Sequence, residues 1–213
     1  MTLPQQPLVS IDTVPFLFRD GVLGVVLAER AFEPFQGQAA LPGVLLSTNE
    51  LLADAATRAL STKAGIGRES IRIITGAGVF DNPDRDPRGP TLSIVHTVIL
   101  DPDTAMDASA TMVRAAEARG LPFDHDAIIE RTAGTVLDAL WVDASLTRAL
   151  LGRSFTTASA ARLTRELAAA AGRPEPLTNN LSRDLAKNPA LVKTSSASEP
   201  AGRGRPAAGW TWK

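Results

Sequence analysis

The sequence contains no cysteine, which excludes disulfide bonds, thiol catalysis and cysteine-based zinc sites. Its two histidines, His96 and His125, are too few for a histidine-rich metal site. No apolar run reaches the length of a membrane-spanning helix, and residues 1–7 have neither the positive cluster nor the apolar stretch of a signal peptide. We therefore expect a cytoplasmic protein with no membrane partner, and the missing cysteines fit a reducing compartment.

The composition is that of a globular protein with one large domain or two smaller ones, because 44% of the 213 residues are hydrophobic and 21% are charged. The net charge of −1 is distributed unevenly. Residues 1–140 contain 11 Lys/Arg and 18 Asp/Glu, a net charge of −7, and residues 141–213 contain 11 Lys/Arg and 5 Asp/Glu, a net charge of +6. The basic end indicates a polyanionic partner, although surface charge also varies along chains without a functional cause.

The first part of the chain predicts strands around a single short helix. Residues 9–18 and 22–28 predict two strands joined by a turn at Asp20-Gly21, and residues 71–80 and 91–100 predict two more. Between them, residues 50–64 predict a helix. Asn49 is placed to cap its start, and Gly65 can supply the left-handed residue after its last turn.

The second part predicts three further helices. A long helix is expected over about residues 124–151, with Asp124 as its cap, and we place a domain boundary after it, between residues 1–152 and 153–213. Beyond the boundary, Thr156 or Thr157 caps a helix that runs to about Ala171, and residues 177–187 form a shorter one. Residues 191–193 and 209–212 are expected to pair as strands, which gives the element order of a winged helix-turn-helix.

The helix at residues 50–64 carries the most informative motif. Residues 41–66 (LPGVLLSTNELLADAATRALSTKAGI) resemble the Nudix box, G-x5-E-x7-R-E-U-x-E-E-x-G-U, in which U is apolar. The positions that match are Glu50, Arg58, Leu60, Gly65 and Ile66. The positions that differ are Val44 in place of the first glycine and Ala59, Thr62 and Lys63 in place of the three later glutamates.

The resemblance implies a helix that has lost its chemistry. In Nudix enzymes the later glutamates hold Mg²⁺ or Mn²⁺, and a hard cation of this kind needs carboxylate oxygens. Alanine offers none, and Lys63 places a positive charge where the ion would sit. We therefore expect no catalytic residue, no metal and no enzyme activity, while the remaining residues suit an Arg–Glu pair and a helix end. Taken alone, this segment is also compatible with an ordinary capped amphipathic helix.

Three other segments extend the resemblance over residues 9–212. Residues 84–94 (DRDPRGPTLSI) and 121–129 (LPFDHDAII) resemble stretches of the Nudix-related transcriptional regulators of NAD metabolism. Residues 204–212 (GRPAAGWTW) resemble the end of the winged domain in that family.

This resemblance implies an α+β protein with two parts. Residues 1–152 would form a Nudix-type α/β/α sandwich with a mixed sheet, which senses ADP-ribose or a related NAD-pathway nucleotide. Residues 153–213 would form a winged helix-turn-helix that binds double-stranded DNA, as a homodimer on a palindromic operator. The expected function is ligand-responsive transcriptional regulation, with repression as the expected mode and no cofactor beyond the effector.

For the effector, the candidate residues are cations that can pair with a diphosphate and an aromatic ring that can stack on a base. They are Arg30, Phe32, Arg58, Arg85 and Arg88. Structural alternatives remain open for the arginines: Arg58 can be held by Glu50 or Asp54, and Arg85 and Arg88 can pair with Asp84 and Asp86 inside their own loop.

For DNA, the candidates lie on the second helix of the winged domain and in the basic loop that follows. Asn and Arg side chains can contact base edges in the major groove, and arginines among glycines suit phosphates or the minor groove. The candidates are Thr178, Asn179, Asn180, Ser182, Arg183, Arg203 and Arg205. The alternative is a core helix formed by Leu177, Leu181 and Leu185 with an ordinary polar face.

Two other functions stay open at this point. The chain could be a Nudix pyrophosphatase that acts on ADP-ribose-like substrates with metal ligands from elsewhere, or a nucleotide or sugar sensor that does not bind DNA. Metal-dependent turnover distinguishes the first from a regulator, and DNA binding distinguishes the second.

Overall fold

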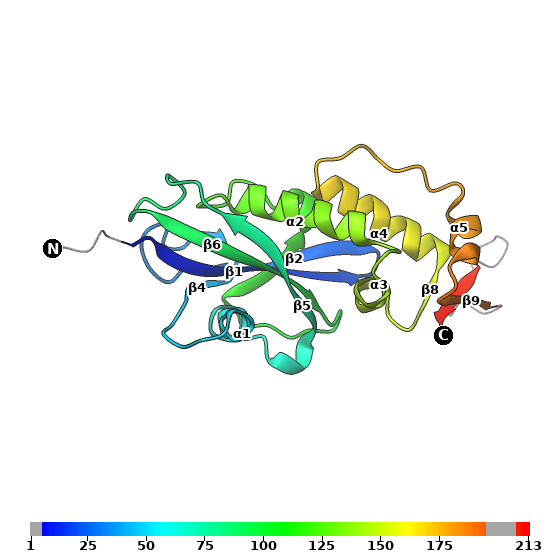
Figure 1. Cartoon of the computed structure of the whole chain (residues 1–213), viewed down its shortest axis with the longest axis horizontal. Helices are drawn as coiled ribbons and strands as arrows, with labels where there is room; N and C mark the ends of the chain where they lie inside the picture. The colour runs from blue at the N-terminus through cyan, green and yellow to red at the C-terminus, as the bar shows by residue number, and fades with distance from the viewer. Residues whose placement is uncertain (1–5, 195–207) are drawn as a thin grey trace.

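The structure, a computed structural model, describes residues 6–194 and 208–213 and contains a large and a small β-sheet (Figure 1). The strands of the large sheet are β1 (Leu8–Arg19), β2 (Val22–Glu29), β3 (Ala39–Ala40), β4 (Gly43–Leu45), β5 (Ile71–Phe80), β6 (Thr91–Leu100) and β7 (Ala110–Arg114). Their order is β3-β2-β1-β6-β5, with β4 paired to β1 and β7 paired to β2. Because β1 runs parallel to β6 and antiparallel to β2, the sheet is mixed, as expected.

The central strands are formed by apolar sequence that is buried on both faces. In β1 the eight residues from Ile11 to Phe18 are all buried, which suits a strand covered by helices on either side. The turn to β2 is made by Asp20 and Gly21, which both have positive φ angles, of 53° and 76°. This confirms the tight Asp-Gly hairpin that the sequence predicts.

Helix α1 (Leu52–Ala64) covers one face of the large sheet (Figure 1). It ends as predicted: Gly65 has a left-handed φ of 64°, and the amide of the buried Ile66 donates to the carbonyl of Leu60. Its start differs from the prediction, because Leu51 occupies the cap position and makes no side-chain cap. Asn49 has a positive φ of 62° in the preceding turn and therefore lies outside the helix.

The opposite face is covered by α2 (His125–Ala139) and α4 (Thr157–Ala170), with α3 (Ala144–Leu151) beside them (Figure 1). The expectation of one long helix over residues 124–151 was wrong. The chain leaves the helix at Leu140, Trp141 has a positive φ of 69°, and the Asp143 carboxylate accepts from the amides of Ser145 and Leu146 to start α3. An N-cap aspartate ahead of a second apolar stretch was the missed signal.

The C-terminal part is a helix-turn-helix with a small sheet. The Thr156 hydroxyl caps α4 by accepting from the Ser159 amide, as predicted. The second helix, α5 (Leu181–Lys187), starts four residues later than expected. The strands are β8 (Ser154–Thr156), which the sequence did not predict, and β9 (Leu191–Thr194) and β10 (Gly209–Trp212), in the order β8-β10-β9. This is the expected winged helix-turn-helix arrangement.

One hydrophobic core includes residues from both parts of the chain. Phe18 and Leu23 of the large sheet belong to the same buried cluster as Leu163 and Leu167 of α4 and Trp210 of β10. The division after residue 152 stays a prediction, and the core crosses it. The remaining elements are the short 3-10 helices η1 (Arg68–Ser70) and η2 (Ala115–Glu117). Within the part of the chain that is described, no helix combines the length and apolarity that crossing a bilayer requires.

Candidate functional site

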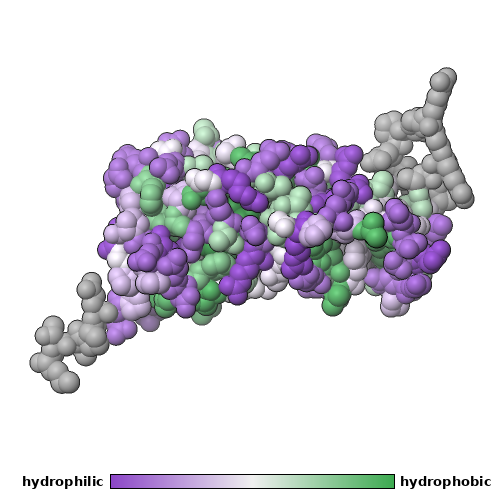
Figure 2. All heavy atoms as spheres, turned by 90° about the horizontal axis from the view of Figure 1, so that it is seen from above, coloured by the Kyte–Doolittle hydropathy of each residue, from purple (hydrophilic) through white to green (hydrophobic). Residues whose placement is uncertain are grey.

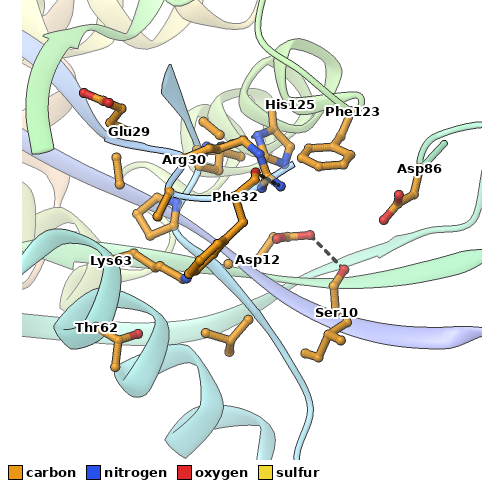
Figure 3. A pocket seen from close by; sticks show the side chains of 18 of the residues that line it. Ser10, Asp12, Glu29, Arg30, Phe32, Thr62, Lys63, Asp86, Phe123 and His125 are labelled. Atoms are coloured by element: carbon orange, nitrogen blue, oxygen red, sulfur yellow. Dashed lines mark hydrogen bonds between the residues drawn. The ribbon is translucent and has the colours of Figure 1, made fainter. Parts of the chain in front are cut away.

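A cavity of about 630 Å³ opens between α1, the loop after β2 and the start of α2 (Figure 3). Its wall includes Ser10 and Asp12 of β1, the turn from Leu41 to Gly43, and Thr62 and Lys63 of α1. Gly43 is required here, since a Cβ at this position would collide with the Asp12 carboxylate. All five residues predicted to bind the effector, namely Arg30, Phe32, Arg58, Arg85 and Arg88, line this cavity. Their contacts separate them into three groups.

Arg58 belongs to the first group, because Glu50 holds it in a bidentate ion pair. Its Nε and Nη2 lie 2.7 Å from the two carboxylate oxygens of Glu50, and Nη2 also donates to the carbonyl of Leu45. The side-chain hydrogen bonds from Arg58, followed by the Ser47 amide, lower the pKa of Glu50 to about 2. The alternative that Arg58 is locked to Glu50 is confirmed. The pair fixes the chain before α1 to the middle of that helix.

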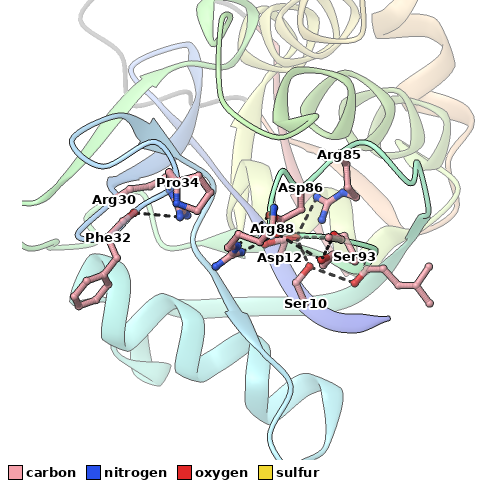
Figure 4. Close-up of polar contacts among 12 residues, drawn as sticks. Ser10, Asp12, Arg30, Phe32, Pro34, Arg85, Asp86, Arg88 and Ser93 are labelled. Carbon is pink, nitrogen blue, oxygen red and sulfur yellow. Dashed lines mark hydrogen bonds and ion pairs between the residues drawn. The ribbon is translucent and has the colours of Figure 1, made fainter. Parts of the chain in front are cut away.

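Arg85 and Arg88 form the second group, and carboxylates pair with both (Figure 4). Arg85, with only 2% of its side chain exposed, lies 2.8 Å from Asp124 and 3.5 Å from Asp12. The alternative that it pairs with Asp84 in its own loop was wrong, because the fold brings residues distant in sequence to its buried guanidinium. Arg88 does pair within the loop, at 2.7 Å from Asp86.

Asp12 is the common partner in this network. Its carboxylate accepts hydrogen bonds from the hydroxyls of Ser10 and Ser93, and it lies within ion-pair distance of Arg85 (Figure 4). The network connects β1, β6, the loop at residues 81–90 and the start of α2. The sequence predicts that the Asp124 side chain caps α2, and this prediction was wrong. The carboxylate pairs with Arg85 instead.

Arg30 and Phe32 form the third group, because the charge of the Arg30 guanidinium and the face of the Phe32 ring stay available to a ligand. The guanidinium of Arg30 donates to the carbonyls of Pro34 and Phe32 and lies 4.6 Å from the centre of the Phe123 ring. Burial and then the nearby Arg88 lower its pKa. Within the described residues, no carboxylate forms an ion pair with it. Phe32 is 73% exposed at the rim, where a base could stack on its ring.

Neither Phe123 nor His125 was predicted from the sequence as an effector residue. Both line the cavity. His125 is buried, and its Nδ1 accepts the amide hydrogen of Leu41 at 3.0 Å, which places the proton of the neutral ring on Nε2. Burial lowers its pKa to about 4 against an opposing effect of Asp12. The sequence signal that could have indicated them is the segment LPFDHDAII, which contains both residues and resembles a stretch of the Nudix-related regulators.

The cavity does not suit the divalent metal that the Nudix box implies. Ala59 is fully buried and offers no oxygen, the Thr62 hydroxyl donates to the carbonyl of Arg58 at 2.7 Å, and Lys63 brings a positive charge. Glu50, the remaining box carboxylate, already pairs with Arg58. Across residues 6–194 and 208–213, no three acidic, histidine or cysteine side chains gather in a way that could hold an ion. The donor set therefore fits an anion better than Mg²⁺.

The candidate DNA surface lies at the opposite end of the molecule, around α5 (Figure 1). Thr178, Asn179 and Asn180 precede the helix instead of lying in it, because the helix begins at Leu181. Arg183 is exposed, and Ser182 is half-buried. Leu177 is 93% exposed, so the alternative of a three-leucine core face is wrong at this residue. The remaining two candidates, Arg203 and Arg205, lie outside the described residues.

The large sheet and helix α1 have the arrangement of a Nudix-type domain. The elements α4, α5 and β8 to β10 have that of a winged helix-turn-helix. No protein-family model matches the chain. A solved structure with this fold over its whole length is NrtR of Shewanella oneidensis complexed with a 27mer DNA. It is 21% identical, with a TM-score of 0.71, over 96% of this chain and 93% of that one.

Two further proteins match the first part of the chain. The NUDIX domain of the same NrtR, solved with ADP ribose, is 25% identical with a TM-score of 0.56, over 62% of this chain and 90% of that one. The ADP-ribose pyrophosphatase of Methanocaldococcus jannaschii is 29% identical over 124 residues, which are 54% of this chain and 72% of that protein. These similarities establish the fold, and the function is argued from the site.

Proposed function

We propose that this chain is a ligand-responsive transcriptional regulator. Its Nudix pocket binds ADP-ribose or a related NAD-pathway nucleotide without hydrolysing it, and its winged helix-turn-helix binds double-stranded DNA. The observation that carries the proposal is that a Nudix pocket without its metal carboxylates shares one hydrophobic core with a DNA-binding fold. The solved complexes of NrtR with DNA and of its Nudix domain with ADP ribose support the same division of labour.

The pocket suits a nucleotide diphosphate in size and in chemistry. Its volume of about 630 Å³ lies within the usual range for small-molecule sites. Phe32 at the rim offers a surface for a base, and Arg30 offers a cation without a carboxylate partner in the described residues. Lys63, which replaces a metal-binding glutamate, adds a second cation to the wall.

A homodimer forms part of the proposal. One winged helix-turn-helix contacts a short stretch of DNA, and two copies related by a two-fold axis match the symmetry of a palindromic operator. The face that carries α2 and α4 shows small apolar areas separated by polar residues and no large apolar patch (Figure 2), so the dimer is argued from the symmetry of the DNA and not from this surface. Sedimentation at micromolar concentration tests this, and a monomer with and without DNA would contradict it.

DNA binding is tested by selecting duplexes from a random pool and comparing the selected sequence with scrambled DNA by fluorescence anisotropy at two salt concentrations. A regulator binds the selected duplex at least about a thousandfold more tightly. Equal binding to both sequences at each salt concentration would contradict the regulator and favour a nucleotide or sugar sensor that does not bind DNA.

A Nudix pyrophosphatase is the second candidate, and the 29% identity to the M. jannaschii enzyme favours it. Loss of carboxylates at Ala59, Thr62 and Lys63 argues against it. The test is product formation from ADP-ribose, NADH and nucleoside diphosphate sugars with Mg²⁺ or Mn²⁺, for which we expect no turnover. Steady turnover that disappears in Glu50→Gln would establish the enzyme instead.

A further inference from the structure

Lys63 occupies an unusual place for a lysine. It lies in the last turn of α1, lines the cavity and is half-buried (Figure 3). In the Nudix pattern this position carries a glutamate that holds the metal. Within the described residues, no carboxylate lies within ion-pair distance of its ammonium group. A partly buried ammonium without a counter-ion retains its attraction for an anion that enters the cavity.

The other cations of the cavity are already neutralised, with one exception. Glu50 pairs with Arg58, Asp12 and Asp124 pair with Arg85, and Asp86 pairs with Arg88. In the described part of the chain, this leaves two cavity cations without a carboxylate partner, Lys63 from α1 and Arg30 from the loop after β2. Two cations on separate elements can contact the two phosphates of a diphosphate at the same time.

The acidic residues that line the cavity near these two cations are the buried Asp12 and Asp86, which already pair with Arg85 and Arg88, and the exposed Glu29 and Glu33. Glu29 and Glu33 line the cavity but are exposed, so water and salt screen their charge more than that of a buried group. Burial and then Arg88 lower the pKa of Arg30, against the opposing effects of Asp86, Asp12 and, last, Glu33. The buried carboxylates are paired with other arginines and the exposed ones are screened by solvent. Lys63 and Arg30 therefore keep the cavity wall beside α1 positive.

We propose that Lys63 takes the place of the divalent metal and, with Arg30, binds the diphosphate of the effector in a metal-independent way. The nucleotide identity of the effector rests on the proposed function. An ammonium group can neutralise phosphate oxygens and donate hydrogen bonds to them, but it cannot polarise a bound water as Mg²⁺ does. The same substitution thus accounts for binding without hydrolysis.

The test is isothermal titration of the full chain with ADP-ribose and, separately, with inorganic pyrophosphate, in EDTA and in Mg²⁺. Wild type is expected to bind ADP-ribose with the same affinity in both buffers. Lys63→Ala is expected to weaken binding about 10- to 100-fold, as the loss of a charge-assisted contact does. The control is Arg68→Ala, which removes an exposed positive charge outside the cavity wall and leaves the affinity unchanged.

Lys63→Glu gives a second and independent result. In EDTA it is expected to bind ADP-ribose more weakly than Lys63→Ala, and Mg²⁺ is expected to restore part of the affinity because a carboxylate now meets the phosphates through the ion. Thermal melting is expected to show that both variants are folded, because no described hydrogen bond or ion pair involves the Lys63 side chain, with a slightly lower melting temperature for Lys63→Glu, since it places a negative charge in the last turn of α1.

The outcomes separate this inference from the proposed function. Wild-type binding that requires Mg²⁺, or Lys63→Ala binding as tightly as wild type, overturns the role of Lys63 and leaves the regulator intact. Metal-free, Lys63-dependent binding of pyrophosphate without binding of ADP-ribose supports the role and overturns the nucleotide effector. Binding of neither ligand overturns both.

Discussion

His125 is a buried titratable residue at the junction of the pocket and α2. Burial lowers its pKa from 6.5 to about 4, so the folded protein holds the ring neutral while the unfolded chain takes up a proton at higher pH. The unfolded state therefore binds more protons between pH 6.5 and pH 4, and stability falls as the pH is lowered through this window. The shift corresponds to about 3 kcal/mol of unfolding free energy, fully present above pH 6.5.

The measurement is urea unfolding of wild type and of His125→Asn from pH 7.5 to pH 4. Asparagine can keep an acceptor near the Leu41 amide but does not titrate, so the variant is expected to be less sensitive to pH over this range. His96, whose pKa burial also lowers, is present in both proteins and affects them equally. An identical pH dependence of the unfolding free energy in both proteins would show that His125 is protonated as easily in the folded state as in the unfolded state, and would contradict the lowered pKa.

At the level of single residues, the sequence predicted which residues line the pocket better than it predicted the ion pairs that they form. For Arg58, Glu50 was one of the two partners that the sequence offered as alternatives to effector binding, because only eight residues separate the two across one helix start. Arg85 was not assigned to Asp124, because 39 residues separate the two and only the fold brings them together. The positive φ of Phe123 and its contact with Arg30 likewise depend on the tertiary structure.

At the scale of elements, the Arg85 network attaches α2 to the sheet. Removing Arg85 would leave Asp12 and Asp124 near one another without a cation in a mostly buried site. We expect Arg85→Ala to lower the unfolding free energy by about 3 kcal/mol, as the loss of one partner of a buried pair does. Arg88→Ala is the matched control. Its guanidinium is 46% exposed, but its removal leaves the buried Asp86 with only a backbone hydrogen bond and the attraction of Arg85, so we expect a smaller loss than for Arg85→Ala, of about 1 to 2 kcal/mol.

Chemical denaturation of both variants at pH 7.5 checks this expectation. A similar small loss in both would show that the Arg85 pair adds little, for instance because water replaces the guanidinium. The comparison is informative because the two arginines lie three residues apart in one loop and both line the pocket.

Helix α5 contains Arg183, the residue that we expect to be most important for specific DNA binding. Arg183 is exposed in its first turn and forms no described ion pair, so it can reach a guanine edge or a phosphate. Arg183→Ala is expected to abolish specific binding to the selected duplex while the affinity for ADP-ribose stays unchanged. Lys187→Ala, at the far end of the same helix, is the control and is expected to have a smaller effect on specificity. Loss of ADP-ribose binding in Arg183→Ala would indicate misfolding or an error in the domain assignment.

Elements with strong local signals were predicted well, and breaks within apolar stretches were not. The Asp-Gly hairpin, the Gly65 helix end and the Thr156 cap all have sequence signals that act over a few residues. The break between α2 and α3 depends on a left-handed Trp141, whose ring packs 5.8 Å from that of Phe155 in the small sheet. Helical periodicity continues across such a break and therefore hides it.

At the scale of the whole molecule, α4 links the large sheet to the winged helix-turn-helix, of which it is the first helix. The Glu166 carboxylate accepts from the amide of Leu23 in β2 and pairs with Arg114 in β7. Just beyond the same, C-terminal end of α4, Arg173 forms a bidentate ion pair with Asp138 of α2. Since α2 begins at His125 in the pocket wall, a ligand that shifts its first turn acts on an element that contacts α4 of the winged helix-turn-helix.

The central claim is that this connection couples the two ligands. Coupling requires ADP-ribose to bind the DNA-competent and DNA-incompetent forms with different affinities, and thermodynamics makes the effect reciprocal. The most direct measurement is a pair of titrations on one protein preparation: the selected duplex with and without saturating ADP-ribose, and ADP-ribose with and without saturating duplex. We expect each ligand to change the affinity for the other by the same factor, in the range of about 5- to 150-fold. Two affinities that are each independent of the other ligand would contradict the account.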